Sequence, residues 1–537
     1  MQQKNPVIVV GGGMAGLTAA AFLVQAGKPV ILFEKQEKTG GLVNSFDREG
    51  YVFDGGLRAV ESSGMILSTL KELGIEVPLF KSHVSLGIAK HIITLKDTAD
   101  IAAYETMLKD LYPAEAENIR AIVQEIRKVM DYMMVLFASD APAFSETRKD
   151  GEYLRKILLP WLWKLIKTVP KINRLQLPVE EHLKKFTDNQ SLIDIIIQHF
   201  FKGTPTSFAL SYFLFYFDYH YPLGGTGMLS QALERYIREN GGEIRLQTEI
   251  DTLDPEQRQV RDTLGESYTY SQMIWAADLK RLYSMIDITA IKNKRLQKRI
   301  SEKQASLSGL RGAESIFSMY LGINKEKEYF SSRCSEHFFY TPYSSGISKA
   351  ELGRIGKILE EAKDANAESG KAVIKDYLRD YFRYNTFEIS FPVLRDARLA
   401  PKGKTGMIVS TLFDYDLTNF IANAGWYEEF KIFAEDCMIE ILENSIFPGL
   451  SKDIELRFSA TPLSIQRHTG NTDGAIVGWS FTNPYLPVPT SMMKMPSAVN
   501  TILPKVFRAG QWTYSPAGLP ISIMTGRMAA KKLLKSK

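Results

Sequence analysis

The sequence predicts an α/β fold in which one domain is assembled from separated segments and an α+β lobe is inserted between them. Three observations support this prediction. A strand–glycine turn–helix–strand unit opens the chain, a helix–strand pair lies near its middle, and a strand, a glycine turn and a helix close it. With 537 residues the chain is too long for one ordinary core, so two or more lobes are expected.

The opening unit, residues 7–34, alternates strand and helix patterns. It begins with an apolar run, 7–10, typical of a strand that is buried on both faces. The Ala- and Leu-rich segment 17–25 has high helix propensity. A second apolar run, 30–33, ends at the acidic Glu34. This order predicts a strand, a helix and a second, parallel strand.

The turn between the first strand and the helix has the Gly-x-Gly-x-x-Gly spacing, at Gly11, Gly13 and Gly16. Gly11 allows the tight turn, Gly13 lets a pyrophosphate approach the backbone, and Gly16 lets the helix pack close to the sheet. The free N–H groups and the positive dipole end of the helix then face the phosphates. Glu34 lies where a carboxylate binds ribose hydroxyls, so the unit predicts a dinucleotide site.

The next two glycine pairs distinguish between dinucleotides. Gly40-Gly41 forms a turn after the ribose acid, and Gly55-Gly56 ends the segment GYVFDGG. This arrangement resembles the glutathione-reductase-like FAD-binding fold, in its amine oxidase and phytoene desaturase branch, where the first pair lies against the flavin end. The family usually has Arg or Lys where this chain has Leu42, and often Pro where it has Leu57.

The resemblance returns twice further along the chain. Residues 221–250, YPLGGTGMLSQALERYIRENGGEIRLQTEI, predict a turn, a helix and a strand, and the resemblance implies that the end of this strand touches the adenosine side. Residues 272–278, QMIWAAD, predict a central strand. The closing segment 506–530 has Gly-Gln-Trp followed by Gly-Leu-Pro, as on the carotenoid isomerase and retinol saturase side of the family. There Gln511 replaces the usual Asp or Glu that binds the ribityl chain.

The resemblance implies a Rossmann-like FAD-binding domain of the glutathione-reductase/amine-oxidase type with an inserted α+β substrate lobe. The FAD domain is expected to comprise residues 1–84, 221–300 and 500–537, and the lobe residues 85–220 and 301–499, with a helical cap at about 114–200. The expected FAD contacts are Gly11, Gly13, Met14, Ala15, Gly16, Glu34, Lys35, Gly41, Leu42, Gly56, Leu57, Ile250, Gly510, Gln511, Pro520 and Ile521.

The resemblance also implies a long apolar substrate, an isoprenoid or polyene of carotenoid or retinoid type. Flavin N5 would exchange hydride with a C–C or C=C bond, in desaturation, saturation or isomerisation. The aromatic segment 208–221, FALSYFLFYFDYHY, can line a wide apolar pocket because aromatic faces pack on flat polyenes, or it can be core. The chain shows no separate nicotinamide domain, so electrons would be exchanged with a substrate, a quinone, oxygen or a partner.

The sequence identifies no general acid or base. Arg58 and Glu61 follow the second glycine pair and are the catalytic candidates, with a surface or second-shell ion pair as the alternative. Two other functions stay open on the same fold. One is an amine-oxidase-like flavoenzyme, which would carry an aromatic cage by the flavin. The other is a prenyl-lipid escort protein without flavin chemistry, which the retained glycines and Glu34 disfavour.

Residues 152–174, EYLRKILLPWLWKLIKTVPKINR, combine aromatic and basic side chains without an acid after Glu152. Trp161 and Trp163 beside lysines suit a membrane–water interface, where rings lie at headgroup depth. The alternative is a helical cap over the substrate cavity, and the two are compatible. Pro160 and Pro170 are expected to break the segment into short pieces.

Composition limits the remaining partners. The formal net charge is +5, too small for nucleic-acid binding to follow from it. The two cysteines, Cys334 and Cys437, and the scattered histidines predict no metal site, and buried reduced thiols are expected. No signal peptide pattern and no apolar run of the ~20 residues that span a bilayer is present. These features predict a cytoplasmic protein, in peripheral contact with a membrane; the sequence leaves the oligomeric state open.

Overall fold

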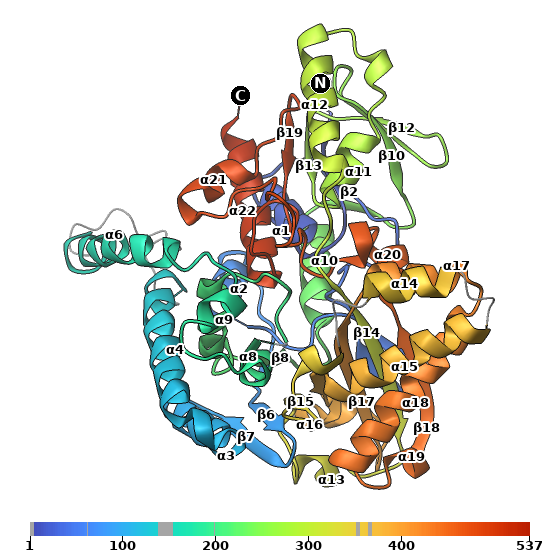
Figure 1. The fold of residues 1–537 in the computed structure, drawn as a ribbon. Coiled ribbons are helices and arrows are strands. Elements are labelled where there is room, and N and C mark those ends of the chain that lie inside the picture. Colours follow the sequence, from blue (N-terminus) through green and yellow to red (C-terminus); the bar gives the residue numbers. More distant parts are fainter. Residues whose placement is uncertain are drawn as a thin grey trace.

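The protein is described by a computed structural model over residues 5–61, 63–137, 154–197, 199–350, 355–363 and 368–536. Two sheets organise it (Figure 1). The first has five parallel strands in the order β19-β13-β1-β2-β9. Its strands are β1 (Val7–Val10), β2 (Val30–Phe33), β9 (Glu243–Arg245), β13 (Gln272–Trp275) and β19 (Val506–Arg508).

The strand β1 lies at the centre of this sheet, between β2 and β13. Val7 is paired with Val30 on one side and with Gln272 on the other. Strands from three distant parts of the sequence therefore form one sheet. The continuous apolar run of β1 follows from this position, because all four of its side chains are buried.

Side chains of β1 alternate between two cores. Val7 and Val9 pack against the helices α1 (Met14–Gln25), α10 (Met228–Glu239) and α22 (Leu519–Lys535). Ile8 and Val10 face the opposite side, which is covered by α11 (Leu279–Ser284), α12 (Lys294–Ser308) and a small antiparallel sheet. That sheet consists of β10 (Ile250–Asp254), β11 (Gln259–Asp262) and β12 (Ser267–Thr269).

The second sheet has seven strands in the order β18-β14-β17-β16-β15-β6-β7. Only β6 and β15 pair in parallel; the other pairs are antiparallel. Its strands are β6 (Val84–Ile88), β7 (His91–Leu95), β14 (Ser315–Ile323), β15 (His337–Thr341), β16 (Phe387–Ser390), β17 (Thr405–Phe413) and β18 (Ile454–Ala460).

One face of this sheet carries an apolar core under α15 (Glu368–Tyr384) and α18 (Tyr427–Ser445). Phe338 and Tyr340 of β15 belong to that core. The alternate residues His337 and Phe339 point to the opposite face, towards the centre of the molecule. The period of two residues in β15 therefore separates core from candidate site.

A helical cap covers the far end of the second sheet. It comprises α3 (Ile101–Leu111), α4 (Ala116–Phe137), α6 (Leu159–Asn173), α7 (Val179–Leu183), α8 (Gln190–Ile197) and α9 (Thr206–Phe215). Figure 1 shows α6 at the left edge of the molecule, beside the end of α4. None of the helices within the described ranges is long and apolar enough to cross a bilayer.

The prediction that prolines divide the basic segment is wrong for its described part; Glu152 and residue 153 lie outside the described residues. The helix α6 runs without interruption from Leu159 to Asn173. Pro160 occupies its first turn, where proline needs no N–H partner, and Pro170 lies in its last turn.

The shorter elements connect these layers. They are α2 (Ser63–Glu72), the hairpin β3 (Ser45–Arg48) and β4 (Tyr51–Asp54), the pair β5 (Leu79–Lys81) and β8 (His220–Pro222), α13 (Lys327–Ser331), α14 (Ile355–Lys363), α16 (Pro392–Arg395), α17 (Tyr415–Asn423), α19 (Leu450–Asp453), α20 (Pro462–Thr469) and α21 (Met495–Ala498). Cys334 and Cys437 are both buried free thiols, as predicted.

Candidate active site

One large cavity, of about 670 Å³, extends between the parallel sheet, the second sheet and the cap. Its lining comes from the glycine turns near both ends of the chain, from β15–β17 and from α6 and α9. Cavities at such junctions are the usual place for ligands in α/β proteins.

The first glycine turn has the geometry that its spacing predicts. Gly11 has φ +104°, and a Cβ there would lie 2.7 Å from the carbonyl oxygen of Ala276, so only glycine fits. A Cβ on Gly13 would meet nothing within 4 Å, which leaves open space in front of the start of α1. A Cβ on Gly16 would lie 1.9 Å from the oxygen of Gly11, so this glycine serves packing.

The acid at the end of β2 is held by backbone amides. Oε2 of Glu34 accepts a hydrogen bond of 2.7 Å from the Gly12 N–H, and Oε1 accepts one of 2.9 Å from the Gln36 N–H. Each oxygen keeps a further lone pair. The side chain lines the cavity, where those lone pairs are available to ribose hydroxyls.

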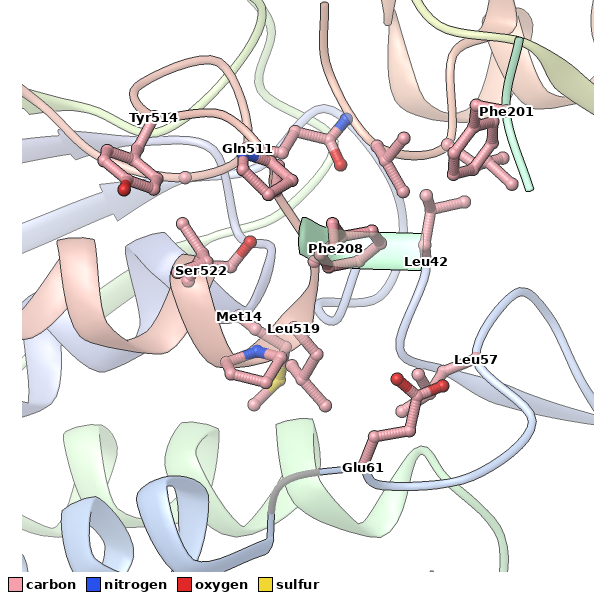
Figure 2. Close-up of a pocket in the computed structure, with 18 of the residues that line it drawn as sticks. Met14, Leu42, Leu57, Glu61, Phe201, Phe208, Gln511, Tyr514, Leu519 and Ser522 are labelled. Atoms are coloured by element: carbon pink, nitrogen blue, oxygen red, sulfur yellow. The ribbon is translucent and has the colours of Figure 1, made fainter. Parts of the chain in front are cut away.

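A second helix starts at the same cavity. The helix α22 begins after Gly518, with Pro520 in its first turn, and neither α22 nor α1 has a side-chain cap. Figure 2 shows Met14 of α1 and Leu519 of α22 next to each other in the cavity wall. Two uncapped helix N-termini thus face one space, and each favours a negatively charged or electron-rich group.

The two later glycine pairs meet beside these helices. The Leu57 N–H donates a hydrogen bond of 2.9 Å to the Leu42 carbonyl, and a Cβ on Gly56 would lie 2.6 Å from the same oxygen. Leu42 and Leu57 both line the cavity (Figure 2). This wall is apolar where the family usually places a basic residue.

These features fit FAD. Open space at the first helix, the Glu34 carboxylate and a second helix start occur in one continuous cavity. Of the expected FAD contacts, the cavity is lined by Gly11, Gly13, Met14, Ala15, Glu34, Gly41, Leu42, Gly56, Leu57, Gly510, Gln511, Pro520 and Ile521.

Three expected contacts do not line the cavity. Gly16 packs closely against the backbone of Gly11, as described above. Lys35 turns away, and its Nζ donates a hydrogen bond of 3.2 Å to the carbonyl of Arg467. Ile250 is a core residue at the start of β10, packed in the cluster that contains Phe33 and Tyr270.

The two catalytic candidates, Arg58 and Glu61, line the cavity rather than the outer surface. Arg58 is buried and donates from Nη1 to the Asp54 carbonyl at 2.5 Å and from Nη2 to the Ser410 hydroxyl at 3.2 Å. Glu61 accepts hydrogen bonds at Oε1 from the hydroxyls of Tyr212, at 2.5 Å, and Tyr219, at 3.0 Å.

Further titratable side chains lie next to Glu61 on the second sheet. Nε2 of His337 lies 3.1 Å from Oε1 of Glu388, and the His337 ring contacts the Tyr219 ring edge-on at 4.9 Å. On the cap, Nε2 of His199 lies 2.5 Å from the Tyr216 hydroxyl. Burial lowers the pKa of His337, and it lowers the pKa of His199 to about 4. Both imidazoles are therefore neutral at pH 7.

The sequence did not indicate His199, His337 or Glu388 as site residues. They come from α8–α9 and from β15 and β16, and no local spacing links them. The only available signal was the alternation of polar and apolar residues in short strands, which predicts a second face without saying what it contacts.

The rest of the wall is apolar. The aromatic segment that was expected to line a pocket or form core does both: Phe208, Tyr212 and Phe215 line the cavity, while Phe213 and Tyr219 are buried in the protein. On the cap helix α6, one face contributes to the wall, with side chains Trp161, Leu165, Val169 and Ile172.

Fold and site together define a dinucleotide-binding flavoprotein with a large, mainly apolar substrate cavity. The model of the family described as flavin containing amine oxidoreductase matches residues 14–325, more than half of the chain. The protein belongs to this family, and it is an FAD-dependent oxidoreductase.

The chain is also similar to carotenoid enzymes over its length. It is 23% identical to the 4,4′-diapophytoene desaturase (4,4′-diaponeurosporene-forming) of Staphylococcus haemolyticus, with 98% of both chains covered. It is 21% identical to the inactive all-trans-retinol 13,14-reductase of Danio rerio, over 86% of this chain and 75% of that one. Among solved structures, wild-type putrescine oxidase bound to putrescine has a TM-score of 0.60 at 12% identity, covering 99% of this chain and 100% of that chain, which shows the shared fold.

Proposed function

We propose that this enzyme acts on a C–C or C=C bond of a long apolar isoprenoid or polyene substrate of carotenoid or retinoid type. The observation that carries the proposal is the continuity of one cavity, from the FAD-binding turns to a wall of aromatic and aliphatic side chains. The similarity of this protein to a carotenoid desaturase over 98% of the chain supports the same substrate class.

The chain's own residues provide binding and orientation. The first helix and Glu34 hold the dinucleotide, and Leu42 and Leu57 form an apolar surface beside it. When bound, FAD supplies hydride transfer at its N5 atom. Phe208 and Phe339 offer aromatic faces on which a flat conjugated chain can lie. The apolar wall excludes water from the bond that reacts.

The experiment that tests this function presents candidate substrates to the flavin-loaded protein in lipid vesicles. The candidates are phytoene, 4,4′-diapophytoene and all-trans-retinol, with putrescine as the polar amine. Chromatography then separates products that differ by two hydrogens from isomers of the starting compound. Turnover of a polyene supports the proposal, and turnover of putrescine alone favours the amine-oxidase alternative.

We also propose that α6 attaches the enzyme to a membrane surface and opens the cavity towards it. The helix has two apolar faces. One lines the cavity; the other carries large side chains that are exposed, with Leu159 58%, Trp163 62% and Ile166 68% accessible. Residues at i, i+4 and i+7 lie on one side of a helix, so these three form one stripe.

The charge around this stripe suits an anionic bilayer. Between residues 154 and 179 the chain has six basic side chains and no acidic one: Arg155, Lys156, Lys164, Lys167, Lys171 and Arg174. Nζ of Lys167 lies 3.2 Å from the centre of the Trp163 ring, so an aromatic ring and an ammonium group share one surface. On the other side of the helix, the Trp161 ring N–H donates a hydrogen bond of 2.9 Å to the Val135 carbonyl of α4. A substrate that is dissolved in lipid could then enter along α6 without crossing water.

A further inference from the structure

Several of residues 57–61 line the cavity, and Glu61 is the one acidic side chain among them. It follows the Gly55-Gly56 pair and enters the cavity beside Leu57 (Figure 2). Leu57 and the hydrogen-bonded Leu42 belong to the turns that meet next to the two helix starts. Glu61 therefore lies between the FAD-binding turns and the aromatic wall.

Two tyrosine hydroxyls fix one edge of this carboxyl. Tyr212 and Tyr219 both donate to Oε1, and their hydroxyl oxygens are 3.1 Å apart. Burial raises the pKa of both tyrosines well above the usual range, so they stay protonated and act as donors. In the described part of the chain no hydrogen bond reaches Oε2, which leaves that oxygen for a group inside the cavity.

The titratable groups that interact with Glu61 come from α9 and the residues after it, and from β16. Tyr212 is on α9, Tyr216 and Tyr219 follow the end of this helix, and Glu388 is on β16. Burial raises the pKa of Glu61 to about 7; the hydrogen bonds from Tyr212 and Tyr219 act against this rise, and the negative Glu388 adds to it. The two imidazoles near it are neutral, so near pH 7 Glu61 is the group best able to take up or release a proton.

We propose that Glu61 is the proton donor and acceptor of the reaction, with Tyr212 and Tyr219 as its positioning residues. This rests on the proposed function, because loss or gain of hydride at one carbon requires loss or gain of a proton at its neighbour. In desaturation, the Glu61 carboxylate takes that proton and the C–H electron pair becomes the new π bond. In saturation, the π pair takes the proton from the Glu61 carboxylic acid. FAD is the two-electron partner in either direction.

Steady-state kinetics of the flavin-loaded protein test the role. Glu61→Gln should lower kcat by about 10²–10⁴-fold with little change in KM, and Glu61→Asp should restore part of the rate. In the wild type, kcat/KM should rise with pH through about 7 if the enzyme desaturates and fall if it saturates. Glu61→Gln should remove that limb of the profile in both cases.

Glu314→Gln is the matched control. Glu314 is a largely buried carboxyl with a raised pKa, it accepts a hydrogen bond of 3.0 Å from the Lys202 N–H, and it does not line the cavity. This variant should keep both kcat and the pH profile. A Glu61→Gln enzyme with kcat within threefold of the wild type, or with only a raised KM, would overturn the proposal in favour of a substrate-binding role.

Infrared spectroscopy gives a readout that does not depend on turnover. The carboxylic acid stretching band of Glu61 should titrate near pH 7 in the wild type and in Glu314→Gln, and be absent in Glu61→Gln. Because Glu61 lines the cavity and both tyrosine hydrogen bonds go to Oε1, added phytoene should shift this band. If added phytoene leaves the position of this band unchanged, the proposed role of Glu61 is wrong. If the wild type turns over no polyene, the proposed function fails, and the same titration still decides whether Glu61 exchanges its proton in the cavity.

Discussion

The backbone N–H of Gly12 donates a hydrogen bond of 2.7 Å to Oε2 of Glu34, which joins the glycine turn to the end of the second strand. Any Cβ on Gly12 would lie 2.9 Å from that oxygen. Turn and acid are thus one unit: the carboxylate orders the loop in front of α1, and it also lines the cavity.

Replacing this carboxylate should weaken FAD binding without unfolding the protein. Glu34→Gln removes charge-assisted hydrogen bonds worth about 1.5–3 kcal/mol, so the Kd for FAD should rise about 10–100-fold. Flavin fluorescence during titration of the apoprotein measures it. Glu37→Gln, at an exposed position three residues on, is the control and should stay within twofold. If FAD affinity falls equally in both variants, Glu34 has no specific role in binding FAD.

Phe208 lines the cavity from the start of α9 and should contribute to substrate binding. Phe208→Ala removes an aromatic face worth about 1–1.5 kcal/mol, so KM for a polyene should rise about five- to tenfold with kcat nearly unchanged. Measurements with the substrate in vesicles check this. An unchanged KM would place the polyene elsewhere in the cavity.

The raised pKa of Glu61 also predicts how stability depends on pH. An acid whose pKa is raised from 4.5 to about 7 in the folded state contributes its full stability below pH 4.5 and loses it as pH rises through 7. At pH 8 the buried carboxylate should destabilise the protein by up to about 3 kcal/mol.

The Glu61→Gln variant has no carboxylate at this position. The difference in free energy of unfolding between this variant and the wild type should therefore shift in favour of the variant by up to about 3 kcal/mol between pH 5 and pH 8. Urea denaturation of the flavin-loaded proteins measures it. Glu117→Gln, whose side chain is 83% exposed, should show a difference below about 0.5 kcal/mol throughout. A pH-independent effect of Glu61→Gln would show that this carboxyl does not titrate in the range.

Membrane attachment through α6 predicts a localised effect of charge. Trp163→Glu with Ile166→Glu should reduce binding to anionic lipid vesicles at least tenfold, in sedimentation with the vesicles, while leaving thermal stability unchanged because both side chains are exposed. Lys164→Gln should weaken binding to anionic vesicles by about fivefold and leave binding to uncharged vesicles unchanged.

The control for α6 lies on the other lobe. Leu264, between β11 and β12, is 89% exposed, and Leu264→Glu should not change vesicle binding. If this variant binds as weakly as the α6 double variant, or if the double variant binds like the wild type, then α6 is not the attachment site.

The sequence predicted what depends on local chemistry. The turn from Gly11 to Gly16 and the acid Glu34 could be assigned because spacing along one strand–turn–helix unit fixes their geometry. The helix and the strand expected within residues 221–250 correspond to α10 and β9.

The rest depends on contacts that are distant in sequence. Glu61, His337 and Glu388 line one cavity although they come from distant parts of the sequence, and β15 and β16 are paired with each other. Ile250 was expected among the FAD contacts; its side chain packs in the core, at the start of β10. Pro160 and Pro170 were expected to break the basic segment into short pieces, yet α6 accommodates the first in its first turn and the second in its last turn.

The visible spectrum of the purified protein decides whether this chain is a flavoenzyme. We expect the spectrum of a bound flavin, with all FAD released on denaturation. Under anaerobic conditions, adding a carotenoid or retinoid polyene should change either the redox state of the flavin or the isomer composition of the polyene. A colourless protein that cannot be reconstituted with FAD would rule out the flavoenzyme and favour a lipid-escort role for the same cavity.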